Sequence, residues 1–121
     1  MRDRLAEVSF EEPGADTVIA TVMGEIDGSN AAEVQRAVAE HVSPTARTLI
    51  IDLSRTAYID STGVELLFEL ARRLTSRRQS FTVVVPVGSG VRRVLELCDI
   101  GSVGVMVATR DEAMAAADRP V

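Results

Sequence analysis

Short apolar runs alternate along this chain with segments whose apolar residues recur every three or four positions. The runs Thr17–Met23, Thr48–Leu53 and Phe81–Val85 are rich in β-branched residues, which predicts buried strands. The segment that follows residue 63 has the spacing of an amphipathic helix. Its apolar positions are Val64, Leu67, Phe68, Ala71 and Leu74.

Turn and capping residues divide the N-terminal third of the chain. Leu5–Phe10 reads as a weaker strand. The Pro and Gly within Glu11–Asp16 predict a turn, so this strand is expected to form a hairpin with the next one. Ser29 or Asn30 is suited to cap a helix that runs to about His41.

The C-terminal third predicts two further helices and a strand. Gly88–Gly90 opens a helix that continues to about Leu97. Val103–Val107 predicts a last short strand. Thr109 and Glu112 have the spacing of a capping box, which opens a short Ala-rich helix.

This order of elements, β-β-α-β-α-β-α-β-α, predicts the fold class. It is typical of an α/β domain with a mixed, mostly parallel sheet of four or five strands and about four helices. We expect a single domain spanning residues 1–121, with the first strand as an antiparallel edge. Functional loops of such sheets gather beyond the carboxyl ends of the strands. The loops Glu25–Asp27 and Asp60–Thr62 are expected on that side.

Composition and charge argue against several classes of function, among them nucleic-acid binding and membrane insertion. The chain has 121 residues, of which 26% are charged and 46% hydrophobic, as in ordinary globular domains. Its formal net charge of -5 argues against broad binding of nucleic-acid phosphates. No apolar run approaches the roughly 20 residues of a membrane span, and the first residues lack the apolar region of a signal peptide. We expect a cytoplasmic protein with no nucleic-acid or membrane partner.

Cysteine and histidine are each present once, which excludes a disulfide within the chain and a Cys/His zinc site. No metal or cofactor is expected. Cys98 shares a helical stripe with Val91, Val94 and Leu95. We therefore expect a buried, inert thiol.

The segment Asp60-Ser61-Thr62-Gly63 is the main candidate site, because it joins a strand to a helix. Free backbone N–H groups and the helix dipole favour negative charge there, so a phosphate added to Ser61 can act as a switch. Thr62 and Glu65 fit a capping box, which leaves the Ser61 hydroxyl available. The alternative is that Ser61 or Asp60 is itself the N-cap and has no further role.

Other sites are weaker. Ser61 lacks the first glycine of a nucleophile elbow, since Ile59 stands there, and the sole histidine, His41, is expected at the far end of a helix. A serine hydrolase is therefore disfavoured, and we expect no catalytic residue.

The loop Gly88–Arg93 lacks the third glycine of a dinucleotide fingerprint and fits a capped helix start, with a weak phosphate site as the alternative. Asp27 is either a turn residue or a contact residue.

Four segments together resemble the STAS family, the domain shared by sulfate transporters and bacterial anti-sigma-factor antagonists. The resemblance covers about Val8 to Ala117, and Asp60–Gly63 is its most specific part. The segments are Gly24–Asp27, Ile51–Ser54 with Tyr58–Gly63, Val91–Leu97 and Asp111–Met114.

The resemblance implies an anti-sigma-factor antagonist, which binds a serine-kinase-type anti-sigma factor and frees a sigma factor. It implies that the kinase phosphorylates Ser61 and that a phosphatase restores binding. Magnesium-ATP would belong to the kinase, and this chain would be its substrate and not an enzyme. The implied partner-binding residues are Asp27, Asp60, Ser61, Thr62 and Gly63.

One departure from the family pattern bears on partner choice. Many members have Leu-Gly after the glycine that matches Gly63, whereas this chain has Val64-Glu65. Two other functions stay open. One is a non-switching scaffold in a signalling assembly, and the other is a small-ligand or nucleotide sensor that uses Gly88–Arg93.

Overall fold

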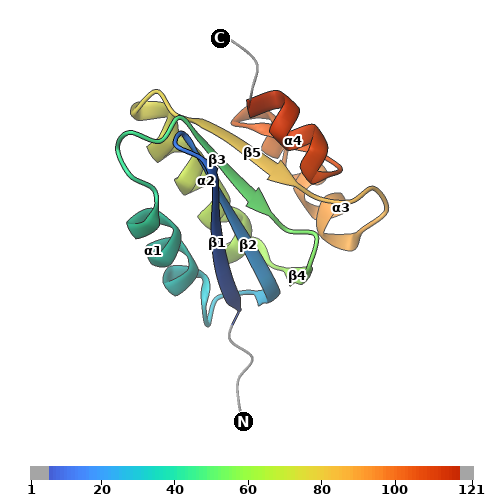
Figure 1. The fold of residues 1–121 in the computed structure, drawn as a ribbon. Helices are drawn as coiled ribbons and strands as arrows, with labels where there is room; N and C mark the ends of the chain where they lie inside the picture. Colours follow the sequence, from blue (N-terminus) through green and yellow to red (C-terminus); the bar gives the residue numbers. More distant parts are fainter. Residues whose placement is uncertain (1–5, 118–121) are drawn as a thin grey trace.

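A computed structural model describes residues 6–117, and within them a mixed sheet is combined with four α-helices (Figure 1). Leu5, the predicted start of the first strand, lies outside the described residues. The elements in chain order are β1 (Glu7–Gly14), β2 (Thr17–Ile26), α1 (Ala31–His41), β3 (Thr48–Asp52), β4 (Thr56–Ile59), α2 (Ser61–Ser76), β5 (Ser80–Val84), α3 (Gly90–Leu97), a 3-10 turn (Ile100–Ser102), β6 (Val105–Val107) and α4 (Arg110–Ala117).

The sheet has the strand order β1-β2-β3-β5-β6 within the described residues, and β4 pairs with β2 beside this path. β1 is antiparallel to β2 and forms an edge, as predicted, whereas the other pairs are parallel. The α/β class, the four helices and the mostly parallel sheet are therefore confirmed, but the sheet of the described residues has six strands where four or five were predicted, because β4 is added. The hairpin extends further than expected, because β1 continues through the predicted turn to Gly14.

Two apolar clusters hold helices on the two faces of the sheet. The larger cluster joins alternate residues of β2, β3 and β5 to α1, α2 and α3. The smaller one joins Ile19, Ile50 and Val84 to Ala113 of α4 on the opposite face (Figure 1). The predicted stripe of α2 is buried at Val64, Leu67, Ala71 and Leu74, and Phe68 is half-buried. The sheet is thus covered unequally, by three helices on one face and by α4 on the other.

An ion pair between the buried Asp52 and the half-buried Arg110 holds α4 on the sheet. The guanidinium of Arg110 donates to Asp52 Oδ2 at 2.7 Å and to Thr21 Oγ1 at 2.7 Å, and it lies 2.9 Å from Glu11 Oε2. Ser54 N donates to the other Asp52 oxygen at 2.9 Å. Burial alone would raise the pKa of Asp52, but the hydrogen bonds from Arg110 and Ser54 outweigh it and hold that pKa below its usual value. One arginine therefore connects α4 to three strands.

β4 is the element that the sequence did not predict. The chain turns after β3, where Thr56 N donates to the carbonyl of Leu53, and Thr56 Oγ1 donates to the carbonyl of Val22. The next residues pair with the end of β2. The helix α2 therefore follows β4 and not the strand Thr48–Leu53. Four residues with two exposed positions give no clear strand signal without their partner.

Cys98 is exposed, so the prediction of a buried thiol is wrong. The reason is that α3 ends at Leu97, and Asp99 adopts the left-handed conformation with φ 61°. The helical stripe stops there, and in α3 only Val91 and Leu95 are fully buried.

Candidate phosphorylation and partner-binding site

The loops after β2 and β4 lie side by side. Ile26 and Ile59, the last residues of these strands, are partners in the parallel pairing. Asp60 N donates to the carbonyl of Ile26 at 3.2 Å. Asp27 and Asp60 therefore leave neighbouring strands at the same edge, as the sequence predicted from the carboxyl ends of parallel strands.

Gly63 seats the first turn of α2 against these strand ends. A β-carbon at this position would lie 2.5 Å from Ile59 Cγ1, 3.0 Å from Ile26 Cγ2 and 3.1 Å from the carbonyl oxygen of Ile26. Real side chains do not tolerate such approaches, so only glycine fits. Gly63 is buried, and any part it has in partner binding runs through the position of this turn.

Asp60 caps α2. Its backbone is extended, with φ -108° and ψ -173°, and its Oδ1 accepts from Gly63 N at 3.0 Å. The helix begins at Ser61, so Thr62 lies within the first turn and is not the N-cap. The predicted capping box of Thr62 and Glu65 is therefore wrong, and Asp60 is the N-cap. This outcome concerns the cap alone, and whether the segment has a further role stays a prediction.

Ser61 is the first residue of α2, and its side chain is exposed. Its backbone N–H and that of Thr62 have no intrahelical partner, since the first turn of a helix leaves such donors unused. In residues 6–117 the Ser61 hydroxyl makes no hydrogen bond that commits it to the fold. Thr62 is exposed too, but its Oγ1 faces the neighbouring loop, 3.7 Å from where a β-carbon on Gly28 would lie.

Asp27 shapes its own loop and still presents a charge. Its Oδ1 accepts from Ser29 N at 2.9 Å and from Ser29 Oγ at 2.6 Å. The side-chain hydrogen bond from Ser29 holds the pKa of Asp27 below its usual value, and the backbone bond adds to this. Asp27 is therefore a turn residue whose carboxylate stays partly exposed. Its role as a contact residue stays a prediction.

Asn30 is a site residue whose role the sequence misassigned. It occupies the N-cap position of α1, but its side chain makes no capping bond. Its amide instead donates to the carbonyl of Glu25 at 2.7 Å, and its Oδ1 accepts from Asp27 N at 3.0 Å. With 2% exposure, Asn30 holds the Glu25–Asp27 segment from inside. Cap and loop-anchor roles use the same residue type, so local sequence cannot separate them.

The site is acidic. Glu25 is exposed on β2 two residues before Asp27, and its strand partner Tyr58 lies two residues before Asp60. Glu65, in the Val64-Glu65 departure from the family pattern, is exposed one helical turn beyond Ser61. The free hydroxyl thus stands among side chains that are negative at neutral pH.

The competing site at Gly88–Arg93 has the geometry of a helix start. Ser89 Oγ accepts from Arg92 N at 3.0 Å and caps α3. The Arg92 guanidinium donates to the carbonyl of Val85 at 2.6 Å and to Glu96 Oε2 at 3.2 Å. Arg92 is therefore engaged within the domain, although a hollow of about 300 Å³ lies beside this loop.

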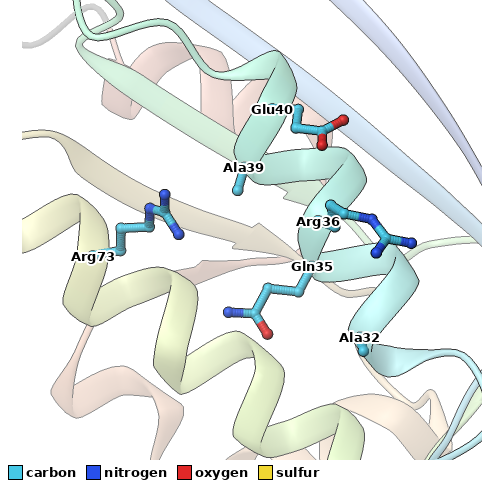
Figure 2. A pocket seen from close by; sticks show the side chains of 6 residues that line it. All are labelled: Ala32, Gln35, Arg36, Ala39, Glu40 and Arg73. Carbon is cyan, nitrogen blue, oxygen red and sulfur yellow. The ribbon is translucent and has the colours of Figure 1, made fainter.

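A second hollow, of about 380 Å³, lies between α1 and α2. Figure 2 shows Gln35 and Arg73 reaching toward each other across it, while the Arg36 and Glu40 side chains extend from the outer side of α1. It is lined by Ala32, Gln35, Arg36, Ala39, Glu40 and Arg73. The residues that line it are exposed or half-buried, and none of them is a buried polar side chain that could bind a ligand.

His41 lies far from Ser61. Its ring stacks on Phe10 with centroids 3.9 Å apart, and its Nε2 lies 2.9 Å from Glu12 Oε2. It ends α1, which has 11 residues and so a length of about 16 Å. The structure does not bring the histidine to the serine, as a hydrolase would require.

The described residues 6–117 contain neither a transmembrane helix nor a cluster of metal-ligating side chains. None of their helices is long and apolar enough to cross a bilayer. They also contain no group of three or more His, Cys, Asp or Glu side chains that could hold a metal ion.

Comparisons with known proteins agree with this architecture. The chain is 28% identical over 99 residues to the "Putative anti-sigma factor antagonist BtrV" of Bordetella bronchiseptica, which covers 82% of this chain and 84% of that protein. It is 31% identical over 64 residues to the "Probable sulfate transporter 3.4" of Arabidopsis thaliana, covering 53% of this chain but only 10% of the transporter.

Solved structures share the fold. An anti-sigma factor antagonist from Mycobacterium paratuberculosis superposes with a TM-score of 0.81 at 25% identity, over 92% of each chain. The Bacillus cell fate determinant SpoIIAA, solved in a phosphorylated form, superposes with a TM-score of 0.67 at 21% identity, over 92% of this chain and 99% of that one. The sequence pattern of the STAS domain family matches residues 9–113. The chain therefore belongs to the STAS domain family.

Proposed function

We propose that this protein is an anti-sigma-factor antagonist. It binds a serine-kinase-type anti-sigma factor, so that a sigma factor is released. Phosphorylation of Ser61 by that kinase ends the binding, and a phosphatase restores it. The observation that carries the proposal is the uncommitted, exposed hydroxyl of Ser61 at the first residue of α2, beside the Asp27 loop.

The switch works by charge. A kinase must hold the phosphates of its ATP against the hydroxyl that it modifies. A phosphate on Ser61 adds about -1.5 to -2 charges at neutral pH. This charge would face the nucleotide phosphates that remain in the partner, within a surface that has lost its water. Repulsion and the cost of desolvation both weaken the complex.

The fold itself tolerates the phosphate. Ser61 stands at the positive end of the α2 dipole, where a negative group is stabilised by about 0.3–1 kcal/mol. The carboxylate of Asp60 offsets part of this gain. We therefore expect phosphorylation to leave the far-ultraviolet circular dichroism spectrum almost unchanged, and the switch to act on the complex rather than on folding.

The family relatives support the proposal. BtrV carries the name of an anti-sigma factor antagonist and is matched over most of its length. SpoIIAA has been solved in a phosphorylated form, so the fold is compatible with the modification.

Calorimetric titration of variants against the cognate anti-sigma kinase tests the proposal. Ser61→Asp is expected to lose binding, whereas Ser61→Ala should bind but escape the switch. Asp27→Ala should weaken binding without unfolding the domain. Ser43→Asp, which adds the same charge to an exposed loop at the other end of α1, is the matched control and should bind normally. Full binding by Ser61→Asp together with lost binding by Ser61→Ala contradicts the charge switch and favours the scaffold function.

A nucleotide panel in a thermal-shift assay separates the sensor alternative. We expect no stabilisation of this chain alone, because Arg92 is engaged by Val85 and Glu96. A shift that is abolished by Arg93→Ala would instead favour a nucleotide sensor at Gly88–Arg93.

A further inference from the structure

The last part of α2 carries a positive charge that contrasts with the rest of the chain. Between Glu69 and Glu96 the chain has six arginines and no acidic residue, although its formal net charge is -5. Four of the six lie at the end of α2 or just after it, and all four are exposed: Arg72, Arg73, Arg77 and Arg78. Like charges this close repel one another, so a negative partner would be bound favourably here.

The positive region extends to α1 across a groove between the two helices. α1 and α2 lie on the same face of the sheet (Figure 1). Arg36 of α1 and Arg73 of α2 both line the hollow of about 380 Å³ between them, and Figure 2 shows Arg73 reaching toward Gln35. A smaller cavity shares Ala39 and Arg73 with this hollow and is also lined by Arg77. The two spaces are therefore parts of one groove, which has arginines along its length.

The arginines of this groove are not neutralised within the domain. No carboxylate of residues 6–117 forms an ion pair with Arg36, Arg73 or Arg77, although Glu40 also lines the hollow. The helix dipole favours cations at the end of α2, but Arg36 lies in the middle of α1, where it gains nothing from that dipole. Stabilisation of a helix end therefore does not account for the whole groove.

We propose that the groove between α1 and α2 binds an acidic segment of a second protein. Guanidinium groups bind carboxylates through paired N–H donors, and several of them in a row fit carboxylates that recur along an extended chain. The side chains that line the hollow are exposed or half-buried, so a segment that lies across it fits better than an enclosed small molecule. Nucleic acid fits less well, because the whole chain has a net charge of -5.

The groove lies apart from the candidate phosphorylation site. Ser61 and Arg73 belong to the same helix and are separated by about 18 Å along its axis. The inference does not rest on the proposed function. Ser61→Asp, which should abolish binding of the anti-sigma kinase, should therefore leave binding in the groove unchanged.

NMR titration of the isotopically labelled chain with a synthetic peptide of alternating Glu and Ala tests the inference. Backbone amides of α1 and of the second half of α2 should shift, whereas those of the loops after β2 and β4 should not. Arg73→Glu combined with Arg77→Glu should raise Kd at least about tenfold at low salt.

The matched control makes the same change of net charge outside the groove. Arg55→Glu combined with Arg93→Glu alters two exposed side chains and should raise Kd less than about threefold. Arg73→Gln combined with Arg77→Gln removes the charges without reversing them, and it replaces the glutamate variant if that variant does not fold. It should also weaken binding more than the control does.

Three outcomes overturn the inference. One is a peptide that shifts no amide of the groove. Another is an equal loss of affinity in the groove variant and in the control, which would show that only net charge matters. The third is tighter binding of a single-stranded DNA of the same charge than of the peptide, which would favour a nucleic-acid partner.

Discussion

Acidic side chains stand at the carboxyl ends of β2, β3 and β4, but they differ in burial and in their partners. Asp52, at the end of β3, is 3% exposed, and both of its oxygens are engaged, by Arg110 and Ser54. Asp27 and Asp60, after β2 and β4, each use Oδ1 for a local backbone bond and remain at the surface.

The difference arises from what covers each strand end. α4 brings Arg110 over β3, so that the Asp52 charge is paired and serves the fold. Within residues 6–117 no arginine pairs with the carboxylates of Asp27 or Asp60, which stay partly exposed. The same residue type is therefore paired and buried at one strand end and partly exposed at the other two, where we propose that it serves recognition.

Removing Arg110 should produce the largest loss of stability. Arg110→Ala leaves the buried Asp52 carboxylate without its cation, which costs about 2–4 kcal/mol in the free energy of unfolding. Urea denaturation measures the loss. Arg72→Ala, which removes an exposed partner of Glu69, is the control and should cost less than about 1 kcal/mol. Equal effects of the two changes would show that the Asp52 pair is no more important than a surface pair.

Gly63→Ala should disturb both stability and recognition. The added β-carbon meets Ile59 and Ile26, so the first turn of α2 has to move, at about 1–3 kcal/mol. Kinase binding should weaken as Ser61 shifts. Gly90→Ala, at the first residue of α3 with nothing within 4 Å, is the control and should be neutral or slightly stabilising. A fully stable Gly63→Ala variant would contradict the packing described for this turn.

Two substitutions of Asp60 separate the effect of its capping hydrogen bond from the effect of its charge. Asp60→Ala removes the acceptor for Gly63 N and should cost about 1 kcal/mol. Asp60→Asn keeps a capping oxygen, so thermal unfolding should be nearly unchanged while kinase binding weakens. If Asp60→Asn is as unstable as Asp60→Ala, the carboxylate charge and not the cap stabilises this turn.

A fall in pH should lower the free energy of unfolding, because it protonates the Asp52 carboxylate. Its pKa is lower in the folded chain than in the unfolded one, so its contribution is complete above the unfolded value of about 3.9. The contribution is lost as the pH falls below about 4 and through the folded pKa. The free energy of unfolding should therefore fall less steeply on acidification in Asp52→Asn than in the parent chain. Identical slopes would exclude a stabilising charge at Asp52.

Much of the fold was predictable from sequence because its signals are local. β-branched runs, helical spacing and the Thr109–Glu112 capping box describe neighbours along the chain. Glu112 N donates to Thr109 Oγ1 at 3.1 Å, and Thr109 N donates to Glu112 Oε1 at 3.2 Å, as the box requires. β4 was missed because its strand character comes from pairing with β2. The Asp52–Arg110 pair spans 58 residues and has no local signal.

The sequence predicted which loops lie together at the candidate site, but it did not predict which residue caps α2. Asp60, Ser61 and Thr62 are all good N-caps, so local propensity does not choose among them. Gly63 decides which residue is the N-cap. Only glycine fits against Ile26 and Ile59, so position 63 becomes the third residue of the helix. That contact places the cap at Asp60 and leaves Ser61 exposed.

The most direct test of the account is to phosphorylate the chain with its cognate kinase and magnesium-ATP, map the phosphate by fragment mass spectrometry, and titrate the product against the kinase. We expect the phosphate on Ser61, because the Thr62 hydroxyl faces the Gly28 loop. We also expect the modified chain to stay folded and lose its affinity. Phosphate on Thr62 with Ser61 unmodified, or a Ser61-phosphorylated chain that binds as tightly as the unmodified one, would contradict the switch.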